Sequence, residues 1–310
     1  MMDTNKSDTP NWLVAVWPGM GSVAMTAGYY LLSKLGMSQT GEYSPIEFFD
    51  IGHVKVHRGL IRLGQRPRTR FFSWRNPSTE PDLVVLFGES QESDRRYLFA
   101  RNLIEQAKSL GVQRIFTFAA MATEMHPETE SRVFAAATDE ESLQMLNGHD
   151  VIFLDDGHIG GMNGIMLGAA QEAGLSGICL LGEMPHIFAQ FPFPKASLAV
   201  LKVFNSLAGV EMDLSELEQQ SKKMEQQLGE ILSHVEQAIS QGETPQEDFL
   251  PEPEEPEPVL KPEDEKRIEE LFEQSKVDRS KAYLLKQELD RLGLFADYED
   301  RFLDLFKQED

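Results

Sequence analysis

The amino-acid sequence predicts an α/β protein with a mostly parallel or mixed sheet and helices on both faces. Short apolar runs of strand length recur along the first two thirds of the chain, and several are followed by apolar residues at helical spacing. Strands that are apolar throughout are typical of parallel sheets covered on both faces. The last third differs, because a heptad pattern, an acidic proline-rich stretch and a second helical pattern follow there.

The first predicted unit is a strand, a glycine loop and a helix. Residues 12–17 form the apolar run WLVAVW, which Pro-Gly-Met-Gly then stops. Ser22 can cap a helix over 23–35, where apolar residues recur at helical spacing before Gly36 ends the pattern.

The rest of the body is predicted to alternate between strands and helices. Residues 46–75 alternate apolar and polar side chains between Gly and Pro residues, which predicts several short strands or a hairpin. Further strands are predicted at 83–87, 114–118, 132–137, 151–154 and 177–181, and helices at 94–110, 139–147, 163–173 and 195–208.

Five segments follow from these patterns. They are a disordered leader, an α/β body, an amphipathic heptad helix, an acidic proline-rich linker and a helical module, with boundaries at 1–10, 11–210, 211–240, 241–262 and 263–310. The heptad helix has an apolar a/d seam interrupted by Ser221, which predicts a coiled coil or packing on the body. The module's three short amphipathic helices would be marginal alone and are expected to dock on another surface. We expect the body to fold without residues 241–310.

The negative charge is concentrated in this acidic tail. The formal net charge is −22; residues 1–210 hold 17 Lys+Arg against 22 Asp+Glu, whereas residues 211–310 hold 12 against 29. This balance argues against nucleic-acid binding, which depends on Lys and Arg at the phosphates. Cations and aromatics are mixed in residues 58–75, as in RNA-binding surfaces, but alternation in a strand pair explains them more simply.

Cysteine content and targeting patterns bear on the compartment. A single cysteine, Cys179, excludes an intrachain disulfide and argues against a cysteine-built zinc site. The polar N-terminal residues lack the pattern of a signal peptide, and no apolar run reaches the roughly 18 residues that a membrane-spanning helix needs. We therefore expect a cytoplasmic protein with no membrane association.

One candidate ligand site is the loop formed by Gly19, Met20, Gly21 and Ser22. It leaves a buried strand and enters a helix, where free amide groups and the helix dipole can hold a phosphate. The glycines can equally serve only a tight turn, because the loop matches neither the dinucleotide-binding fingerprint nor the P-loop motif.

Carboxylates are the other candidate ligand groups. Asp156 lies beside Asp155 and His158 after a predicted strand, as a general base or metal ligand would, although capping of a turn is the simpler interpretation. Glu89 and Glu183 each follow a buried strand and a glycine, so we expect both at one rim of the sheet. They would serve there as paired acid/base groups or as acceptors for loop amides. No catalytic residue, metal site or cofactor is predicted.

Several segments resemble a known family. These are WLVAVWPGMGSVAMTAGYYLLSKLG, LVVLFGE, IGGMNGIMLGAAQEAGLSGICLLGEMP and FPFPKASLAVLKVFNSLAGVEMDL. Their order and spacing over about 12–240 are similar to those of the proteasome assembly chaperone 2 family. The resemblance implies a fold similar to the phosphorylase/hydrolase α/β fold of nucleoside phosphorylases. It also implies a role as an oligomeric chaperone, since eukaryotic and archaeal relatives help assemble proteasome rings.

Two functions are compatible with the sequence. The preferred hypothesis is a non-catalytic scaffold, a homo-oligomer that holds protein subunits or clients through exposed edges and helices without a cofactor. The alternative is a nucleoside- or nucleotide-binding enzyme of phosphorylase, hydrolase or ATP-dependent ligase type. Under the phosphorylase resemblance, Gly19, Met20, Gly21 and Ser22 would be its phosphate loop.

Overall fold

The computed structural model describes most of the chain. The described residues are 11–44, 47–49, 54–57, 59–63, 66–78, 81–91, 94–240 and 261–307, with only the backbone for 55, 57 and 234–240. The predicted leader and nearly all of the predicted linker lie outside these residues.

The strands are β1 (Asn11–Val16), β2 (Ser38–Tyr43), β3 (Val54–His57), β4 (Leu60–Leu63), β5 (Thr69–Trp74), β6 (Asp82–Gly88), β7 (Val112–Thr123), β8 (Val133–Ala137), β9 (Ile152–Phe153) and β10 (Ser176–Pro185). The helices are α1 (Val23–Lys34), α2 (Arg96–Ser109), α3 (Glu140–Met145), α4 (Gly161–Glu172), α5 (Pro194–Ala208), α6 (Ser215–Ser240), α7 (Pro262–Val277), α8 (Ala282–Arg291) and α9 (Phe295–Asp304). Short 3-10 turns, η1 (Met20–Ser22), η2 (His186–Phe188) and η4 (Arg279–Lys281), precede α1, α5 and α8.

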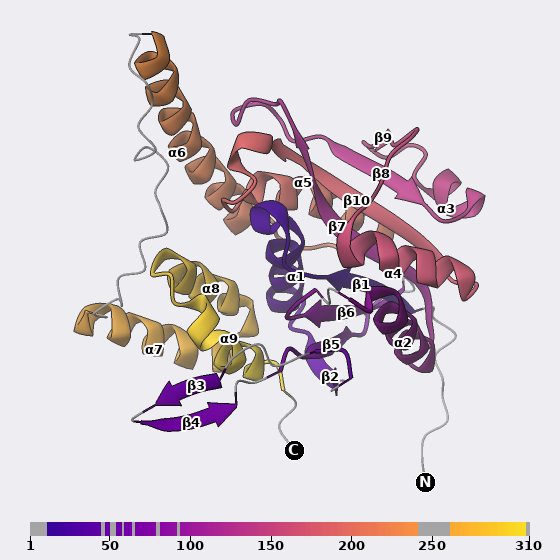
Figure 1. Ribbon diagram of the computed structural model, residues 1–310, viewed down its shortest axis with the longest axis horizontal. Helices are drawn as coiled ribbons and strands as arrows, with labels where there is room; N and C mark the ends of the chain where they lie inside the picture. The colour runs from indigo at the N-terminus through magenta and orange to yellow at the C-terminus, as the bar shows by residue number, and fades with distance from the viewer. Residues whose placement is uncertain are drawn as a thin grey trace.

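A mixed eight-stranded sheet forms the centre of the molecule (Figure 1). Its strand order is β2-β5-β6-β1-β7-β10-β8-β9. The four central strands β6, β1, β7 and β10 run parallel, whereas β5 and β8 flank them in the antiparallel direction. The central strands are apolar along most of their length because both of their faces are buried. The predicted α/β class with a mixed sheet is therefore confirmed.

Helices cover both faces of this sheet. Helices α1 and α5 pack on one face, and α2 and α4 pack on the other. Cys179, the only cysteine in the sequence, belongs to the second of these two apolar layers and is fully buried in β10.

Helix α6 starts on the body and extends beyond it (Figure 1). Its heptad residues Leu217 and Leu228 are buried, and the helix packs along α5. Ser221, the polar interruption of the seam, is also buried and donates its hydroxyl to the carbonyl oxygen of Leu217 at 2.7 Å. The first half of the seam is therefore covered by the body, and a coiled coil stays a prediction.

The three C-terminal helices pack on α1 and extend the core on that face. Tyr283 on α8 meets Tyr30 edge to face, with ring centroids 4.5 Å apart. Phe295 and Phe302 on α9 contact Tyr29 in the same edge-on manner. These contacts join residues of α1 and of the last 50 residues in one apolar layer.

The structure differs from the sequence-based expectation in strands β2 and β10, whereas it agrees with the hairpin expected within residues 46–75. β2, which lies at one edge of the sheet, was not predicted. The C-terminal segment of the same chain contacts this edge, because the Gln39 amide donates to the carbonyl oxygen of Phe306 at 2.7 Å. Residues 46–75 contain the predicted hairpin, β3–β4, and then β5. β10 is longer than predicted and includes Glu183.

Candidate functional site

The carboxyl ends of the four parallel strands meet at one rim of the sheet. Glu89 directly follows β6, and Glu183 lies near the end of β10. Both therefore lie at this rim, as expected from the strand directions. Strands β1 and β7 lie between β6 and β10, so the backbones at the two glutamates are roughly 14 Å apart. They do not form the paired carboxylates considered from the sequence.

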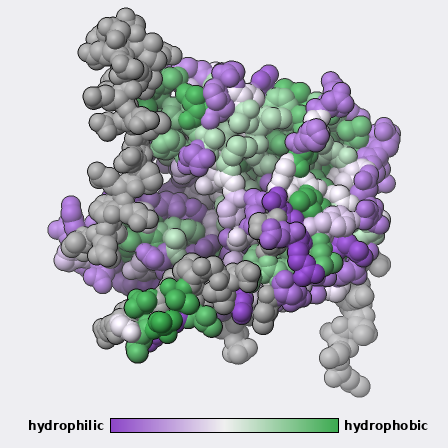
Figure 2. Space-filling view, viewed as in Figure 1, coloured by the Kyte–Doolittle hydropathy of each residue, from purple (hydrophilic) through white to green (hydrophobic). Residues whose placement is uncertain are grey.

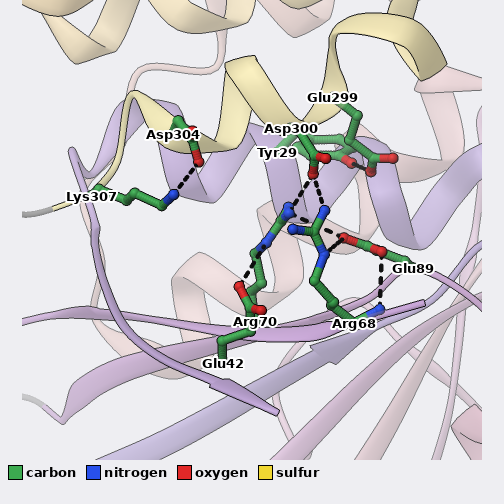
Figure 3. A network of polar contacts seen from close by, with 9 residues as sticks. All are labelled: Tyr29, Glu42, Arg68, Arg70, Glu89, Glu299, Asp300, Asp304 and Lys307. Carbon is green, nitrogen blue, oxygen red and sulfur yellow. Dashed lines mark hydrogen bonds and ion pairs between the residues drawn. The ribbon is translucent and has the colours of Figure 1, made fainter. Parts of the chain in front are cut away.

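Glu89 belongs to a network of ion pairs beneath α9 (Figure 3). It accepts the Arg68 amide at 2.9 Å and the Arg68 Nε at 3.2 Å, and it lies 3.2 Å from Arg70 Nη2. Asp300 of α9 accepts hydrogen bonds from both guanidinium groups, and Glu42 of β2 lies 3.6 Å from Arg70 Nε. Arg70 is only 1% exposed. Three carboxylates from separate elements balance its buried charge, which would otherwise be costly.

Burial and the two arginines shift the pKa values of Glu89 and Asp300 in opposite directions. Burial raises the pKa of Glu89 above its ordinary value, and the amide of Arg68 and the two guanidinium groups offset this effect only in part. For Asp300, burial acts in the same direction, but the hydrogen bond from Arg70 and the charge of Arg68 outweigh it and lower the pKa. The small concavity at Arg70 and Glu89 leaves no room for a water molecule. Helix α9 thus closes this part of the rim.

A second polar link joins α9 to α1. The Tyr29 hydroxyl donates to Glu299 Oε1 at 2.5 Å. Burial, together with the neighbouring charge of Glu299, raises the pKa of Tyr29 far above its ordinary value, so the phenol stays protonated and acts as a donor. Glu89 and Tyr29 are therefore both occupied by contacts within the chain.

Glu183 lies at the part of the rim that α9 does not cover, and its carboxylate is paired within the chain. Its carboxylate accepts two hydrogen bonds from Arg132, at 2.6 Å from Nε and 2.5 Å from Nη2, and one from the Thr123 hydroxyl at 2.8 Å. The hydrogen bond from Arg132 lowers the pKa of Glu183, whose side chain is 1% exposed. A concavity of about 410 Å³ lies beside this pair and is lined by Thr123, Glu124, Met125, Thr129, Arg132 and Glu183.

Two amides of the glycine loop and the first amide of α1 already have acceptors within the chain. The Gly21 amide donates to the Ala189 carbonyl at 2.9 Å, and the Ser22 amide donates to the Gly19 carbonyl at 3.0 Å. The Val23 amide donates to the Met20 carbonyl. Gly21 and Ser22 both adopt positive φ, which fits the tight-turn interpretation, and Ser22 occupies the cap position of α1 without a side-chain capping bond. A phosphate that used the amides of Gly21 and Ser22 would have to displace these backbone hydrogen bonds.

Asp156 follows the edge strand β9 on an exposed stretch of chain. Strand β9, which precedes it, is parallel to β8, and β8 is antiparallel to β10, so β9 runs against the four central strands. Asp155, Asp156 and His158 are all exposed. Within the described ranges, no three His, Cys, Asp or Glu side chains gather as a metal site would require. The structure does not bring Asp156 together with Glu89 or Glu183.

Sequence reasoning missed the groups that pair with the rim carboxylates. Arg68 and Arg70 were noticed only as part of a basic run, and Arg132 only as the start of a strand. The alternation of Arg68 and Arg70 with Thr69 and Phe71 was the available signal, because it predicts that Arg70 on β5 and Arg68, directly before β5, share one face. Asp300 had no such signal, since it lies about 230 residues away along the chain.

The architecture defines the class of protein, and comparison with known proteins gives the family. The class is an α/β protein with a mixed sheet covered on both faces. The sequence pattern of the PAC2 family matches residues 13–232, and the chain belongs to this family. The resemblance to proteasome assembly chaperones found in the sequence is thereby confirmed.

Three relatives illustrate the similarity. The protein MJ1210 of Methanocaldococcus jannaschii, described as uncharacterized, is 31% identical over 243 residues, which are 77% of this chain and 90% of that protein. The crystal structure of Pyrococcus furiosus PbaB, described as an archaeal proteasome activator, is 25% identical with a TM-score of 0.61, covering 74% of this chain and 96% of PbaB. The Mycobacterium tuberculosis proteasome-assembly chaperone homologue Rv2125 shares the fold at 21% identity with a TM-score of 0.61, covering 71% of this chain and 94% of Rv2125.

The matched family region ends before the last three helices. It stops at residue 232, so Asp300 and Glu299, which close the rim at Glu89, belong to the part of the chain outside the match. Within the described ranges, none of the helices combines the length and the apolar character needed to cross a bilayer.

Proposed function

We propose that the protein is a non-catalytic scaffold that binds protein subunits or clients, as a cytoplasmic homo-oligomer related to proteasome assembly chaperones. One observation carries the proposal: the rim groups that the sequence offered as candidates, two carboxylates and two loop amides, make their contacts within the chain. Glu89 and Glu183 each bind arginine, and the loop amides at Gly21 and Ser22 bind backbone carbonyls. Catalytic sites, in contrast, present groups that are free to meet a substrate.

The relatives support the same kind of activity. PbaB is described as a proteasome activator and Rv2125 as a homologue of a proteasome-assembly chaperone, and both names refer to work on protein assemblies. A scaffold needs surface and rigidity instead of reactive groups. The paired arginines supply rigidity, because each one fixes two or more elements at the rim.

The experiment has two arms. In the first, the full-length protein is affinity-purified from its source cells, and its partners are identified and quantified by mass spectrometry. Co-purification of protein-assembly subunits in near-stoichiometric amounts is expected. Recovery of the enzymes of a small-metabolite pathway in their place would contradict the proposal.

The second arm tests the nucleotide-binding alternative. Thermal unfolding is measured with phosphate, nucleosides and ATP, since a ligand at 100 times its dissociation constant would stabilise the protein by about 2.7 kcal/mol. No shift is expected. The matched control is Met20→Glu, which adds a negative charge to an exposed loop position. A nucleotide-dependent shift that this substitution abolishes would show that the loop binds the ligand, and it would contradict a scaffold without a ligand site.

A further inference from the structure

The turn between α3 and β9 carries an asparagine that is followed by a glycine. The sequence holds two such Asn-Gly pairs, Asn147-Gly148 in this turn and Asn163-Gly164 in α4. Asparagine is among the thermolabile residues of proteins. It is most labile before glycine, because glycine has no Cβ to hinder attack of its backbone nitrogen on the asparagine side chain. The two pairs share this local chemistry and differ in the structure around them.

The pair in the turn is exposed and unengaged. Asn147 and Gly148 are both exposed. Helix α3, which leads into the turn, lies at the right edge of the molecule (Figure 1), where the surface is mostly hydrophilic (Figure 2). Within the described residues, neither the Gly148 amide nor the Asn147 side chain has a hydrogen-bond partner. Nothing lies within 4 Å of the position that a Cβ atom would take at Gly148. The groups that would react are therefore free to meet.

The second pair is held by helix α4. Gly164 lies inside this helix, so its amide takes part in the helical hydrogen-bond pattern. The backbone is also tightly packed there, because a Cβ atom at Gly164 would lie 1.9 Å from the carbonyl oxygen of Ile159. Attack by the Gly164 nitrogen on Asn163 thus requires the helix to open locally first.

We propose that Asn147 is a site of spontaneous deamidation in the folded protein. The Gly148 nitrogen attacks Cγ of Asn147 and gives up its proton, the Cγ–Nδ2 bond breaks, and ammonia leaves as a succinimide ring closes. Water then opens the ring at one of its two carbonyl carbons, which yields aspartate when it attacks Cγ and isoaspartate when it attacks the main-chain carbon. The net exchange is one water for one ammonia, so no oxidant, reductant or enzyme is needed. This modification is independent of the proposed function.

Deamidation would alter one edge of the sheet. Either product adds a negative charge to the turn, and isoaspartate also adds one carbon to the backbone path. The turn leads into the edge strand β9, which is held by two residue pairs with β8 and by the Leu154 amide, a donor to the Ala135 carbonyl at 3.0 Å. We therefore expect isoaspartate to weaken this pairing. Gly148, His149 and Asp150 also line a concavity of about 500 Å³ beside α5, so its wall changes as well.

The test follows both asparagines in the same molecules by peptide mass spectrometry. The full-length protein is incubated at neutral pH and physiological temperature. Asn147 is expected to convert at least about tenfold faster than Asn163, because conversion at Asn163 must wait for the helix to open. In urea, which removes the helix, the two asparagines should convert at similar rates.

An independent readout detects the isoaspartate itself. A protein isoaspartyl methyltransferase should label the aged wild type at position 147. The label at this position should be lost in Asn147→Gln, whose longer side chain closes a ring far more slowly. Conversion of Asn147 no faster than that of Asn163 in the folded protein would overturn the proposal, as would a peptide at 147 that stays unlabelled in the aged wild type.

Hydrogen exchange tests the effect on β9. In the isoaspartate form, the Leu154 amide should lose protection relative to the unmodified protein, whereas the amides of β10 at the centre of the sheet should keep theirs. Unchanged protection of Leu154 would overturn the inferred effect on the sheet edge.

Discussion

Arg70 shows how one side chain can join three distant parts of a chain. Its guanidinium meets Glu42 of β2, Glu89 after β6 and Asp300 of α9. A lysine could not replace it, because an ammonium group lacks the planar fork that contacts several carboxylates at once. A buried charge of this kind is tolerated only while its partners remain in place.

Removing the charge of Asp300 tests this residue network. Asp300→Asn leaves Arg68 and Arg70 with one carboxylate fewer, and because Asp300 is half exposed we expect a loss of about 1–2 kcal/mol in the free energy of unfolding. Urea denaturation followed by circular dichroism measures the loss. Asp297→Asn, the same change at an exposed position of α9, should cost much less. Equal effects of the two substitutions would contradict the role of the network.

The pair of Arg132 and Glu183 predicts a dependence of stability on pH. Since the pKa of Glu183 is lowered in the folded protein, the stabilisation is present above its ordinary value of 4.5 and is lost as the pH falls through the lowered pKa. The free energy of unfolding of Arg132→Met should therefore lie below that of the wild type near neutral pH. The gap should narrow as the pH falls below 4.5. Denaturation curves at a series of pH values measure it, and a gap that does not change with pH would refute the assignment.

At the scale of elements, the approach of α5 to β10 depends on a missing side chain. A Cβ atom at Gly182 would lie 2.5 Å from the carbonyl oxygen of Ala196 on α5. Gly182→Ala is therefore expected to push helix and strand apart, at a cost of about 1–3 kcal/mol. The matched control is Gly168→Ala on α4, where a Cβ meets open space and helix propensity predicts a gain of about 0.5–1 kcal/mol. Thermal unfolding should show opposite signs for the two changes.

The elements predicted well from sequence are those that carry their own signal. The central strands are apolar runs, as in Leu83–Phe87, and α1 and α5 show helical spacing with Gly or Pro at their ends. The strand β2, with the sequence SQTGEY, was missed because an edge strand has no buried face to mark it. The direction of β9 was not predictable either, since a two-residue strand gains its direction from its neighbour β8.

The position of the two rim carboxylates was predicted from the sequence, but their pairing with arginine was not. Strand order alone placed Glu89 and Glu183 at one rim. Their partners could not be predicted, because Arg132 and Asp300 reach them only through tertiary packing. Sequence therefore indicated where polar groups gather, whereas only the structure shows that those groups are already paired.

At the scale of the whole molecule, the last three helices are part of the core. From the sequence we expected the body to fold without residues 241–310. The packing leads to a different expectation, because removal of these residues would expose Tyr29, Tyr30 and Phe72 and leave Arg70 without Asp300.

A chain ending at residue 240 should therefore bind a dye specific for apolar surface and scatter light through aggregation. A chain lacking residues 1–10 is the control and should behave like the full-length protein. If the shortened chain is soluble, binds no dye and unfolds at the wild-type temperature, residues 241–310 are a separate module, as the sequence suggested.

Because Cys179 is buried, its reactivity can report local opening of the central sheet. The sequence contains no other cysteine, and burial raises the pKa of this thiol to about 12. Almost no thiolate exists at neutral pH, and no reagent can reach the sulfur while β10 is covered on both faces. The rate at which Cys179 reacts with a thiol reagent therefore measures how often the centre of the sheet opens. For the same reason, a cysteine introduced at an exposed position can carry a fluorescent or spin label without first replacing the native one.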